Sequence, residues 1–279
     1  MNKTLLLHLI MTKKLFLHSG IVTLLLMLVA CGGYNKMLKG DDYDKKQSLA
    51  DKFYDEEEWP RAATLYEQIY QRYSRSSVGE VAYFRLGKCS YMMDDYIMGG
   101  YYLKSFPARF PGSQLSEEAT FLAAMCSVKN SPQYSLDQAD TYLALSDLQL
   151  FIDEYPTSNL VDSCNNIMDR LRAKLEVKKY DNSKLYYKME NYRASVAAFD
   201  AFLEEYPNSI HREEVLFLSV KSEYLLAANS VESKKKERLD DTIKRYRIFA
   251  NAFPESKSLS EAEGYREKAE KALLLVKQL

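Results

Sequence analysis

The stretch Phe110-Pro111-Gly112-Ser113 is the first of four copies of a motif that runs aromatic residue, proline, any residue, serine. The other copies are Tyr155-Pro156-Thr157-Ser158, Tyr206-Pro207-Asn208-Ser209 and Phe253-Pro254-Glu255-Ser256, and Tyr73-Ser74-Arg75-Ser76 is a fifth copy without proline. Proline lacks a backbone N–H and forces the residue before it out of helical geometry, so each copy marks a helix end. The aromatic residues lie 37 to 51 positions apart. This period predicts an all-α array of helical repeats.

Within the repeat, the first two copies align without a gap at an offset of 37 residues. Small residues at Ala50, Gly87 and Ala124 allow the two helices of a repeat to approach closely, and residues three and four apart share a buried face. The pattern resembles the tetratricopeptide (TPR) repeat. It predicts a solenoid over residues 41–279, with five helix pairs and a capping helix from Glu261 to Lys277. The aligned pairs are Leu49/Leu86, Ala50/Gly87, Trp59/Tyr96, Ala62/Gly99, Tyr66/Leu103 and Ile69/Phe106.

Two later repeats are longer than the first. Their extra residues, Asn130–Ser135 and Ser230–Lys236, are predicted to form surface loops between the first and second helices of the repeat. The run Lys234-Lys235-Lys236 is interpreted as solvated charge rather than as a patch that binds lipid or nucleic acid.

The composition argues against several classes of function, namely nucleic acid binding, metal binding and catalysis. The chain has 38 basic and 39 acidic side chains, so it lacks the positive field that a nucleic acid partner requires. Only three histidines occur, and no phosphate-binding loop or metal-ligand spacing is present. Cys89 and Cys126 occupy equivalent places in successive repeats, where neighbouring helix axes lie about 8 to 10 Å apart, too far for a disulfide. We therefore expect buried, unpaired cysteines, no cofactor, no metal and no enzymatic activity.

The N-terminal 30 residues have the form of a secretory signal peptide. They contain three lysines, no acidic residue and an apolar run from Ile21 to Ala30 that is shorter than the ~20 residues of a membrane span. Translation from Met11 instead of Met1 would leave a signal of 20 residues.

The end of this segment, Leu28-Val29-Ala30-Cys31, resembles the lipobox of bacterial lipoproteins, in which the cysteine is acylated and becomes the first residue. A buried anchor helix with an incidental cysteine is the other interpretation, but Ala30, Gly32 and Gly33 suit access by modifying enzymes better. Residues 31–40 would then be a lipidated linker, and two or more acyl chains on Cys31 would hold the protein to a bilayer. By analogy with lipoproteins, the residues after Cys31 indicate the periplasmic side of the outer membrane.

Two stretches resemble the BamD family of TPR lipoproteins of the outer-membrane β-barrel assembly machinery. One runs from Ser131-Pro132 to Tyr155-Pro156-Thr157-Ser158, and the other from Leu171-Arg172-Ala173-Lys174 to Tyr206-Pro207-Asn208-Ser209. The resemblance implies a non-catalytic scaffold that binds a BamA-type barrel subunit and unfolded outer-membrane proteins. It also implies that the carboxy-terminal repeats, with Tyr186, Tyr187 and Tyr192, form the BamA side, although these tyrosines also suit packing within the array.

Counting from the small residues predicts which side chains the first helices turn toward a peptide-binding groove. Aromatic and apolar residues there would contact an aromatic-ended barrel segment, and Lys88 would meet a carboxylate. Ordinary packing between repeats is an equally good explanation for any one of these aromatic residues. The predicted contacts are Tyr54, Phe84, Lys88, Tyr91, Phe121 and Met125.

Other binding proteins share parts of this pattern. A periplasmic TPR adaptor of cell-envelope division or peptidoglycan coordination has similar repeats, but it is commonly soluble or carries a long coiled coil. A SusD-like glycan-binding lipoprotein is roughly twice as long and has tryptophan platforms, whereas this chain has only Trp59. Both remain alternatives to the assembly function.

Overall fold

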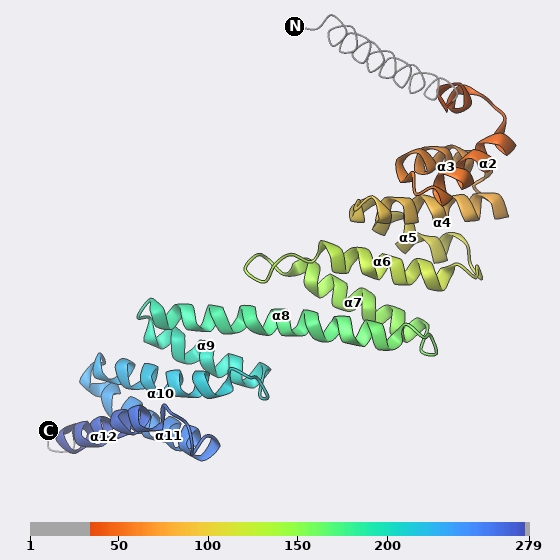
Figure 1. The fold of residues 1–279 in the computed structure, drawn as a ribbon. Helices are drawn as coiled ribbons and strands as arrows, with labels where there is room; N and C mark the ends of the chain where they lie inside the picture. Colours follow the sequence, from red (N-terminus) through yellow and green to blue (C-terminus); the bar gives the residue numbers. More distant parts are fainter. Residues whose placement is uncertain (1–33, 277–279) are drawn as a thin grey trace, which may run out of the picture. The chain divides into compact units, whose positions relative to one another are not determined.

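The computed structural model describes residues 34–276, and every regular element in that range is an α-helix (Figure 1). Cys31 and the predicted signal peptide lie outside the described residues. A short helical stretch covers residues 34–39. The longer helices are α2 (Tyr43–Asp55), α3 (Trp59–Tyr73), α4 (Ser77–Met92), α5 (Tyr96–Arg109), α6 (Ser116–Asn130), α7 (Ala139–Glu154), α8 (Val161–Lys188), α9 (Tyr192–Glu205), α10 (Arg212–Ala228), α11 (Glu232–Ala252) and α12 (Leu259–Val276).

These helices form the predicted hairpins, α2–α3, α4–α5, α6–α7, α8–α9 and α10–α11, followed by α12 at the position expected for the capping helix. The all-α, TPR-like prediction is confirmed. None of the described helices is both long and apolar enough to cross a membrane.

The aromatic-proline motif ends helices in the way the sequence predicts. Phe110, Tyr206 and Phe253 are the C-caps of α5, α9 and α11, with φ between −126° and −137° and ψ between 66° and 72°, outside helical geometry. The serine N–H then donates to the carbonyl of the aromatic residue, at 3.2 Å from Ser113 to Phe110 and 3.1 Å from Ser256 to Phe253. Proline at the second position of such a turn already has the required φ, so the motif stops the helix and reverses the chain.

The opposite ends of three hairpins share a second device. Glu57, Asp94 and Glu190 have φ of 58° to 60°, the left-handed conformation of a helix C-cap motif. The residue after each one donates its N–H to a carbonyl five residues back, as Asp95 does to Ser90 at 3.0 Å. In two of the hairpins that residue also caps the following helix, because Asp95 accepts from the N–H of Met98 and Asn191 from that of Ala194.

The predicted loop Ser230–Lys236 is wrong, because α11 begins at Glu232 and contains the three lysines. Each lysine pairs with an acidic residue three or four positions away, a spacing that places both side chains on one face of a helix. The pairs are Lys234–Glu237, Lys235–Glu232 and Lys236–Asp240, at 3.0 to 3.1 Å. The segment lacks glycine and proline, so nothing stops the helix from starting early. The other predicted loop is present, between α6 and α7.

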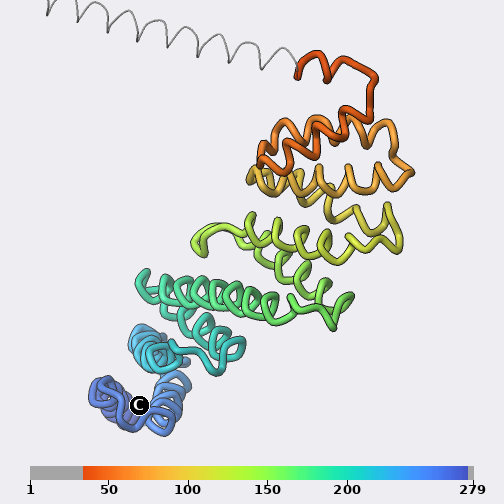
Figure 2. The backbone as a smooth tube through the Cα atoms, turned by 45° about the vertical axis from the view of Figure 1, so that its right-hand side comes forward, coloured from red at the N-terminus to blue at the C-terminus, as the bar shows by residue number. Residues whose placement is uncertain are grey.

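The described residues fall into two compact units. The first contains the hairpins from α2 to α7, and the second contains residues 132–139 with α8 to α12. Within each unit, successive hairpins stack in chain order (Figures 1 and 2). Cys89, Cys126 and Cys164 are buried and unpaired, as expected. Burial raises the pKa of the Cys89 thiol to about 12, which makes it a small apolar residue at neutral pH.

In the second unit, the loop before α7 is fixed onto α8 through its carbonyl groups. Lys174 donates to Pro132 at 2.8 Å, and Lys178 donates to Leu136 at 2.5 Å. The buried amide of Gln138 donates to the same Leu136 carbonyl and to two further carbonyls in the loop, those of Gln133 and Asp137. The extra residues of the third repeat therefore form an ordered loop, in which side chains donate hydrogen bonds to the backbone carbonyl groups.

Candidate protein-binding face

The six predicted contact residues lie on the first helices of three successive hairpins. Tyr54 is on α2; Phe84, Lys88 and Tyr91 are on α4; Phe121 and Met125 are on α6. All six belong to the first unit, and we call this surface the first-helix face. The small residue that precedes Lys88 in the repeat, Gly87, lies against Leu103 of α5, which fixes the rotation of α4 about its axis.

The α2 end of the face is organised by Arg85, which the sequence did not single out. Its guanidinium donates to Asp51 at 2.6 Å and to the Tyr66 hydroxyl at 2.8 Å, and Tyr66 in turn donates to Asp51 at 2.8 Å. Burial raises the pKa of Tyr66, so its hydroxyl stays protonated and available as a donor. The ring of Tyr54 lies 4.8 Å from this guanidinium and edge-on to Trp59. Three helices are thus joined through one cation.

At the centre of the face, Lys88 donates to Glu118 of α6 at 2.6 Å. Burial lowers the pKa of Lys88, but the hydrogen bond to Glu118 and the neighbouring charges outweigh this effect and raise the pKa overall. Phe84 is only 5% exposed, lies 5.8 Å from the Lys88 ammonium and packs edge-on against Phe106. Phe84 is therefore a core residue beneath the face, while the ammonium is at its surface.

The remaining predicted residues are half-buried. Tyr91 packs edge-on against Tyr96 at 5.6 Å, and Phe121 packs edge-on against Phe151 of α7 at 5.5 Å. Met125 occupies the place in α6 that Lys88 occupies in α4, one residue after the small residue of the repeat. Tyr91 and Phe121 are thus each held by an aromatic neighbour and remain partly open to solvent.

The pairing of lysine with glutamate recurs in the second unit. Lys184 of α8 binds Glu214 of α10 at 2.7 Å, and Lys221 of α10 binds Glu261 of α12 at 3.0 Å. Lys184 and Lys221 are 37 residues apart, the offset already seen in the first two repeats. In all three pairs the glutamate is the third residue of its helix, where the helix dipole favours a negative charge. These pairs tie each first helix to the next one within its unit.

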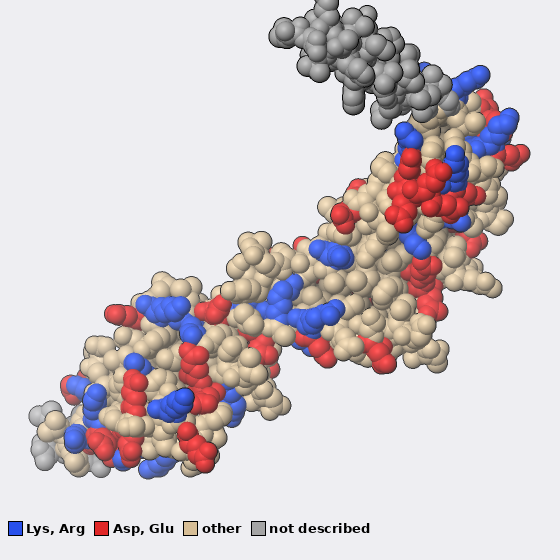
Figure 3. All heavy atoms as spheres, viewed as in Figure 1, with Lys and Arg blue, Asp and Glu red and all other residues tan. Residues whose placement is uncertain are grey.

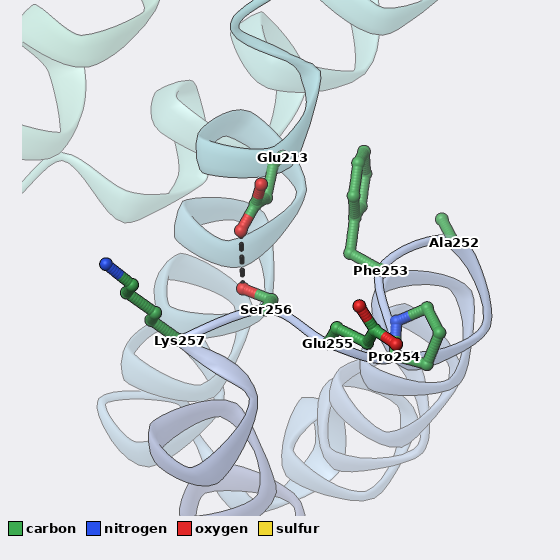
Figure 4. Close-up of a pocket in the computed structure, with 7 residues that line it drawn as sticks. All are labelled: Glu213, Ala252, Phe253, Pro254, Glu255, Ser256 and Lys257. Atoms are coloured by element: carbon green, nitrogen blue, oxygen red, sulfur yellow. Dashed lines mark hydrogen bonds between the residues drawn. The ribbon is translucent and has the colours of Figure 1, made fainter.

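A pocket of about 500 Å³ lies where the last motif turn meets α10 (Figure 4). The hydroxyl of Ser256 donates to Glu213 at 2.6 Å across it, and Phe253 and Pro254 form part of its wall. The same hydrogen bond occurs in the first unit, from Ser113 to Glu80 at 2.5 Å. The serine of the motif therefore fastens the turn to the first helix of its own repeat, which gives this pocket a structural explanation.

The described residues hold no cluster of three or more side chains able to bind a metal ion. Acidic and basic side chains are interleaved over the surface visible in Figure 3 rather than gathered by sign. The geometry offers aromatic edges, apolar side chains and single charges along successive helices, which is what a surface for protein segments requires.

The fold defines a TPR-like helical-repeat protein, and the first-helix face is its candidate protein-binding surface. The sequence matches the family described as YfiO, outer membrane lipoprotein, over residues 43–239 and again over 176–278, and the chain belongs to this family. It is also similar to the outer membrane protein assembly factor BamD of Caulobacter vibrioides, with 23% identity over 177 residues. That alignment covers 63% of this chain and 58% of the relative.

Proposed function

We propose that this chain is a lipid-anchored subunit of an outer-membrane β-barrel assembly machinery. In this proposal it faces the periplasm, binds a BamA-type barrel subunit and receives unfolded outer-membrane proteins. The observation that carries the proposal is the family match, which spans residues 43–278 and therefore all helices from α2 to α12. The similarity to a protein named as an assembly factor supports it, as does the lipobox-like sequence that ends at Cys31.

The first-helix face is proposed to bind the unfolded client. Tyr54, Tyr91 and Phe121 supply half-buried surface whose aromatic neighbours already restrict their motion, so binding costs little side-chain entropy. Met125 adds further half-buried apolar surface. Lys88 exchanges Glu118 for a carboxylate of the client. Phe84 supports the Lys88 side chain from below and does not itself need to be accessible.

The second unit is proposed to bind the barrel subunit. Tyr187 packs against Tyr192 at 6.3 Å, so this pair belongs to the packing of the unit, whereas Tyr186 and its neighbours Leu185 and Met189 are exposed at the end of α8. Exposed apolar side chains gathered at one helix end are a feature of protein contact surfaces.

The anchor is tested by Cys31→Ala in cells. We expect the variant to leave the membrane fraction and the wild-type protein to carry an acyl mass at its first residue. A wild-type protein without acyl mass, or a variant that stays in the membrane, rejects the anchor.

Client binding is tested with the purified mature protein and a urea-unfolded outer-membrane barrel protein diluted into buffer. We expect Lys88→Met and Tyr54→Ala to weaken binding by about threefold to tenfold each, the usual cost of losing one charged or aromatic contact. The matched control is Lys184→Met, which removes the same type of ion pair from the second unit. Equal loss in the control would overturn the assignment of the client to the first-helix face.

The partner is tested by purifying the protein from detergent-solubilised outer membranes. Recovery of a large β-barrel with periplasmic domains supports the proposal. Recovery of division proteins would favour the TPR adaptor, and recovery of a glycan importer would favour the SusD-like alternative.

A further inference from the structure

A groove on the first unit is not explained by the repeat packing. Two cavities of about 420 and 250 Å³ lie between α5 and α7 over α6, and both are lined by Lys104, Ala123 and Asp147. They are the two halves of one groove, divided by the ion pair from Lys104 to Asp147 at 2.8 Å. The predicted contact residues of the first-helix face line neither half. We call this feature the α5–α7 groove.

The walls of the groove are apolar and exposed. Ile97 and Tyr101 stand on α5 at 76% and 61% exposure, and Leu143 and Leu150 on α7 are exposed as well. Residues four or seven positions apart lie on one face of a helix, so each wall is a single stripe. Large apolar side chains that face each other across a groove and remain in water mark an interaction site.

We call the larger cavity, which Gly100 lines, the upper half of the groove and the smaller cavity the lower half. Packing does not require glycine at Gly100. A Cβ on Gly99 would lie 3.1 Å from the Tyr91 amide nitrogen and 3.2 Å from the Cys126 sulfur, so Gly99 is required where α5 crosses its neighbours. A Cβ on Gly100 would meet only the Cys126 Cβ, at an ordinary 3.5 Å. Glycine inside a helix costs about 1 kcal/mol relative to alanine. The chain bears this cost at Gly100, and the result is a deeper groove.

The charges in the groove are arranged unequally. The Asp147 side chain is 10% exposed and accepts from both Lys104 and Ser127, so its oxygens are occupied. The Lys104 side chain is 56% exposed and retains N–H groups for a second acceptor. Glu154 is exposed and lines the lower half. A partner therefore meets a positive charge at the middle of the groove and a negative charge in its lower half.

The spacing of the walls selects the conformation of the partner. Leu143 and Leu150 are seven residues apart on one helix face, about 10.5 Å along the axis. In an extended strand, residues about 10 Å apart are three positions apart and point to opposite sides. In a helix, residues i and i+7 are about 10.5 Å apart on the same side, with i+3 and i+4 between them.

We propose that the α5–α7 groove docks an amphipathic helix of a partner protein. The apolar residues of this helix at positions i and i+7 enter the two halves of the groove. An acidic residue at i+3 or i+4 meets Lys104, and a basic residue at i+11, one turn beyond i+7, meets Glu154. This site is separate from the first-helix face, so the protein can hold a folded partner element and an extended client segment at the same time.

The test measures binding of a helical peptide to the Cys31→Ala protein by fluorescence anisotropy. The peptide is cross-linked through its side chains and has leucine at i and i+7, glutamate at i+4 and arginine at i+11. We expect saturable binding that Gly100→Leu weakens by about tenfold or more, because the new side chain fills the groove. Gly100→Leu also adds a good helix former at a position with room for its Cβ, so the fold is retained, which a thermal melt verifies.

Charge exchange provides the second arm. Lys104→Glu should weaken binding of the peptide with glutamate at i+4 by about tenfold. A peptide with lysine at i+4 should bind this variant with the lost affinity restored. Absence of saturable binding, equal binding to Gly100→Leu, or tighter binding of an uncross-linked peptide with alternating apolar residues would overturn the proposal. Loss of unfolded-client binding in Gly100→Leu would assign the groove to the client instead and would equally overturn the docked helix.

Discussion

The two units build the same helix crossings with different side-chain chemistry. In the first unit the crossings use Ala50, Ala62 and Gly87, and a Cβ on Gly87 would come within 2.9 Å of Leu103. In the second unit the buried residues at such crossings include Ser195 and Ser222, whose hydroxyls hydrogen-bond each other at 3.0 Å. The repeat thus requires a small side chain, and it accepts a polar one when a second hydroxyl satisfies it.

The units also differ in where they place charge. In the first unit the Arg85–Asp51 pair lies at the surface, with the acidic side chain 40% exposed, and the one buried carboxylate among its described residues, Asp147, pairs with a lysine whose side chain is 56% exposed. The second unit buries Glu223, whose side chain is 5% exposed, against Arg245 at 3.0 Å. Arg245 also binds both carboxylate oxygens of Asp200 on α9, at 2.6 and 2.7 Å. One cation therefore holds α9, α10 and α11 together, and the second unit should be the more sensitive to its removal.

The largest effect is expected from Arg245→Ala. This change leaves the Glu223 charge buried without its partner, which should lower the free energy of unfolding by about 3 to 5 kcal/mol. Urea denaturation measures the loss. The matched change in the first unit, Arg85→Ala, should cost about 1 kcal/mol or less, because water solvates Asp51. Adding Glu223→Gln to Arg245→Ala should recover part of the loss; no recovery would show that packing rather than charge explains it.

The next largest effect is expected at Gly79, which lies beside Tyr73-Ser74-Arg75-Ser76, the copy of the motif without proline. At that turn a Cβ on Gly79 would lie 1.9 Å from the Tyr73 carbonyl oxygen, closer than any contact the backbone could keep. Gly79→Ala should therefore destabilise the protein by about 1 to 3 kcal/mol, the usual cost of overpacking. Gly100→Ala is the control for glycine replacement within a helix, and it should stabilise the protein by about 0.5 to 1 kcal/mol. Thermal melts of the two variants should shift in opposite directions.

The serine pair allows a direct test of the first difference between the units. Ser195→Ala or Ser222→Ala alone leaves one buried hydroxyl unsatisfied and should cost about 1 to 2 kcal/mol. The double variant converts the crossing to the alanine chemistry of the first unit and should cost less than the sum of the single changes. Strict additivity in this double-mutant cycle would mean that the hydroxyls do not depend on each other.

Much of the fold follows from local sequence. The aromatic-proline turns, the small residues of the crossings and the capping helix were all predictable because each depends on residues near one another in the chain. The start of α11 was not, because the charge pairs that favour helix around Lys234 also resemble a loop of solvated residues. The Arg245 cluster joins residues up to 45 positions apart, and no local pattern indicates which carboxylates will meet.

The candidate site was predicted only in part. Counting from the small residues correctly placed the six residues on successive first helices, but it could not separate the buried Phe84 ring from the accessible Lys88 ammonium one turn later. Arg85 could have been found from its position one turn before Lys88, on the same helix face. The α5–α7 groove depends on the open space next to Gly100. A sequence shows which residue is present, but it does not show whether neighbouring helices leave space beside it.

The smallest expected effect is the pH dependence of stability, which distinguishes the partly solvated Glu214 from the buried Glu223. Burial tends to raise the pKa of Glu214, but hydrogen bonds from Lys184 and Tyr180 outweigh it and hold the pKa below the ordinary 4.5. Its contribution to stability is therefore present above pH 4.5 and is lost as the pH falls through the folded value. Glu214→Gln should cost about 0.5 kcal/mol at pH 7, because the pair is partly solvated, and nothing at low pH.

Glu223 should show the opposite sign, since burial raises its pKa above 4.5 despite Arg245. The ionised form is then disfavoured in the folded state, so its contribution is largest below pH 4.5 and declines as the pH rises through the folded value. Relative to the wild type, Glu223→Gln should gain stability between pH 4 and pH 7 while Glu214→Gln loses it. Urea unfolding at these two pH values distinguishes them, and parallel behaviour would contradict the contrast between a surface pair and a buried one.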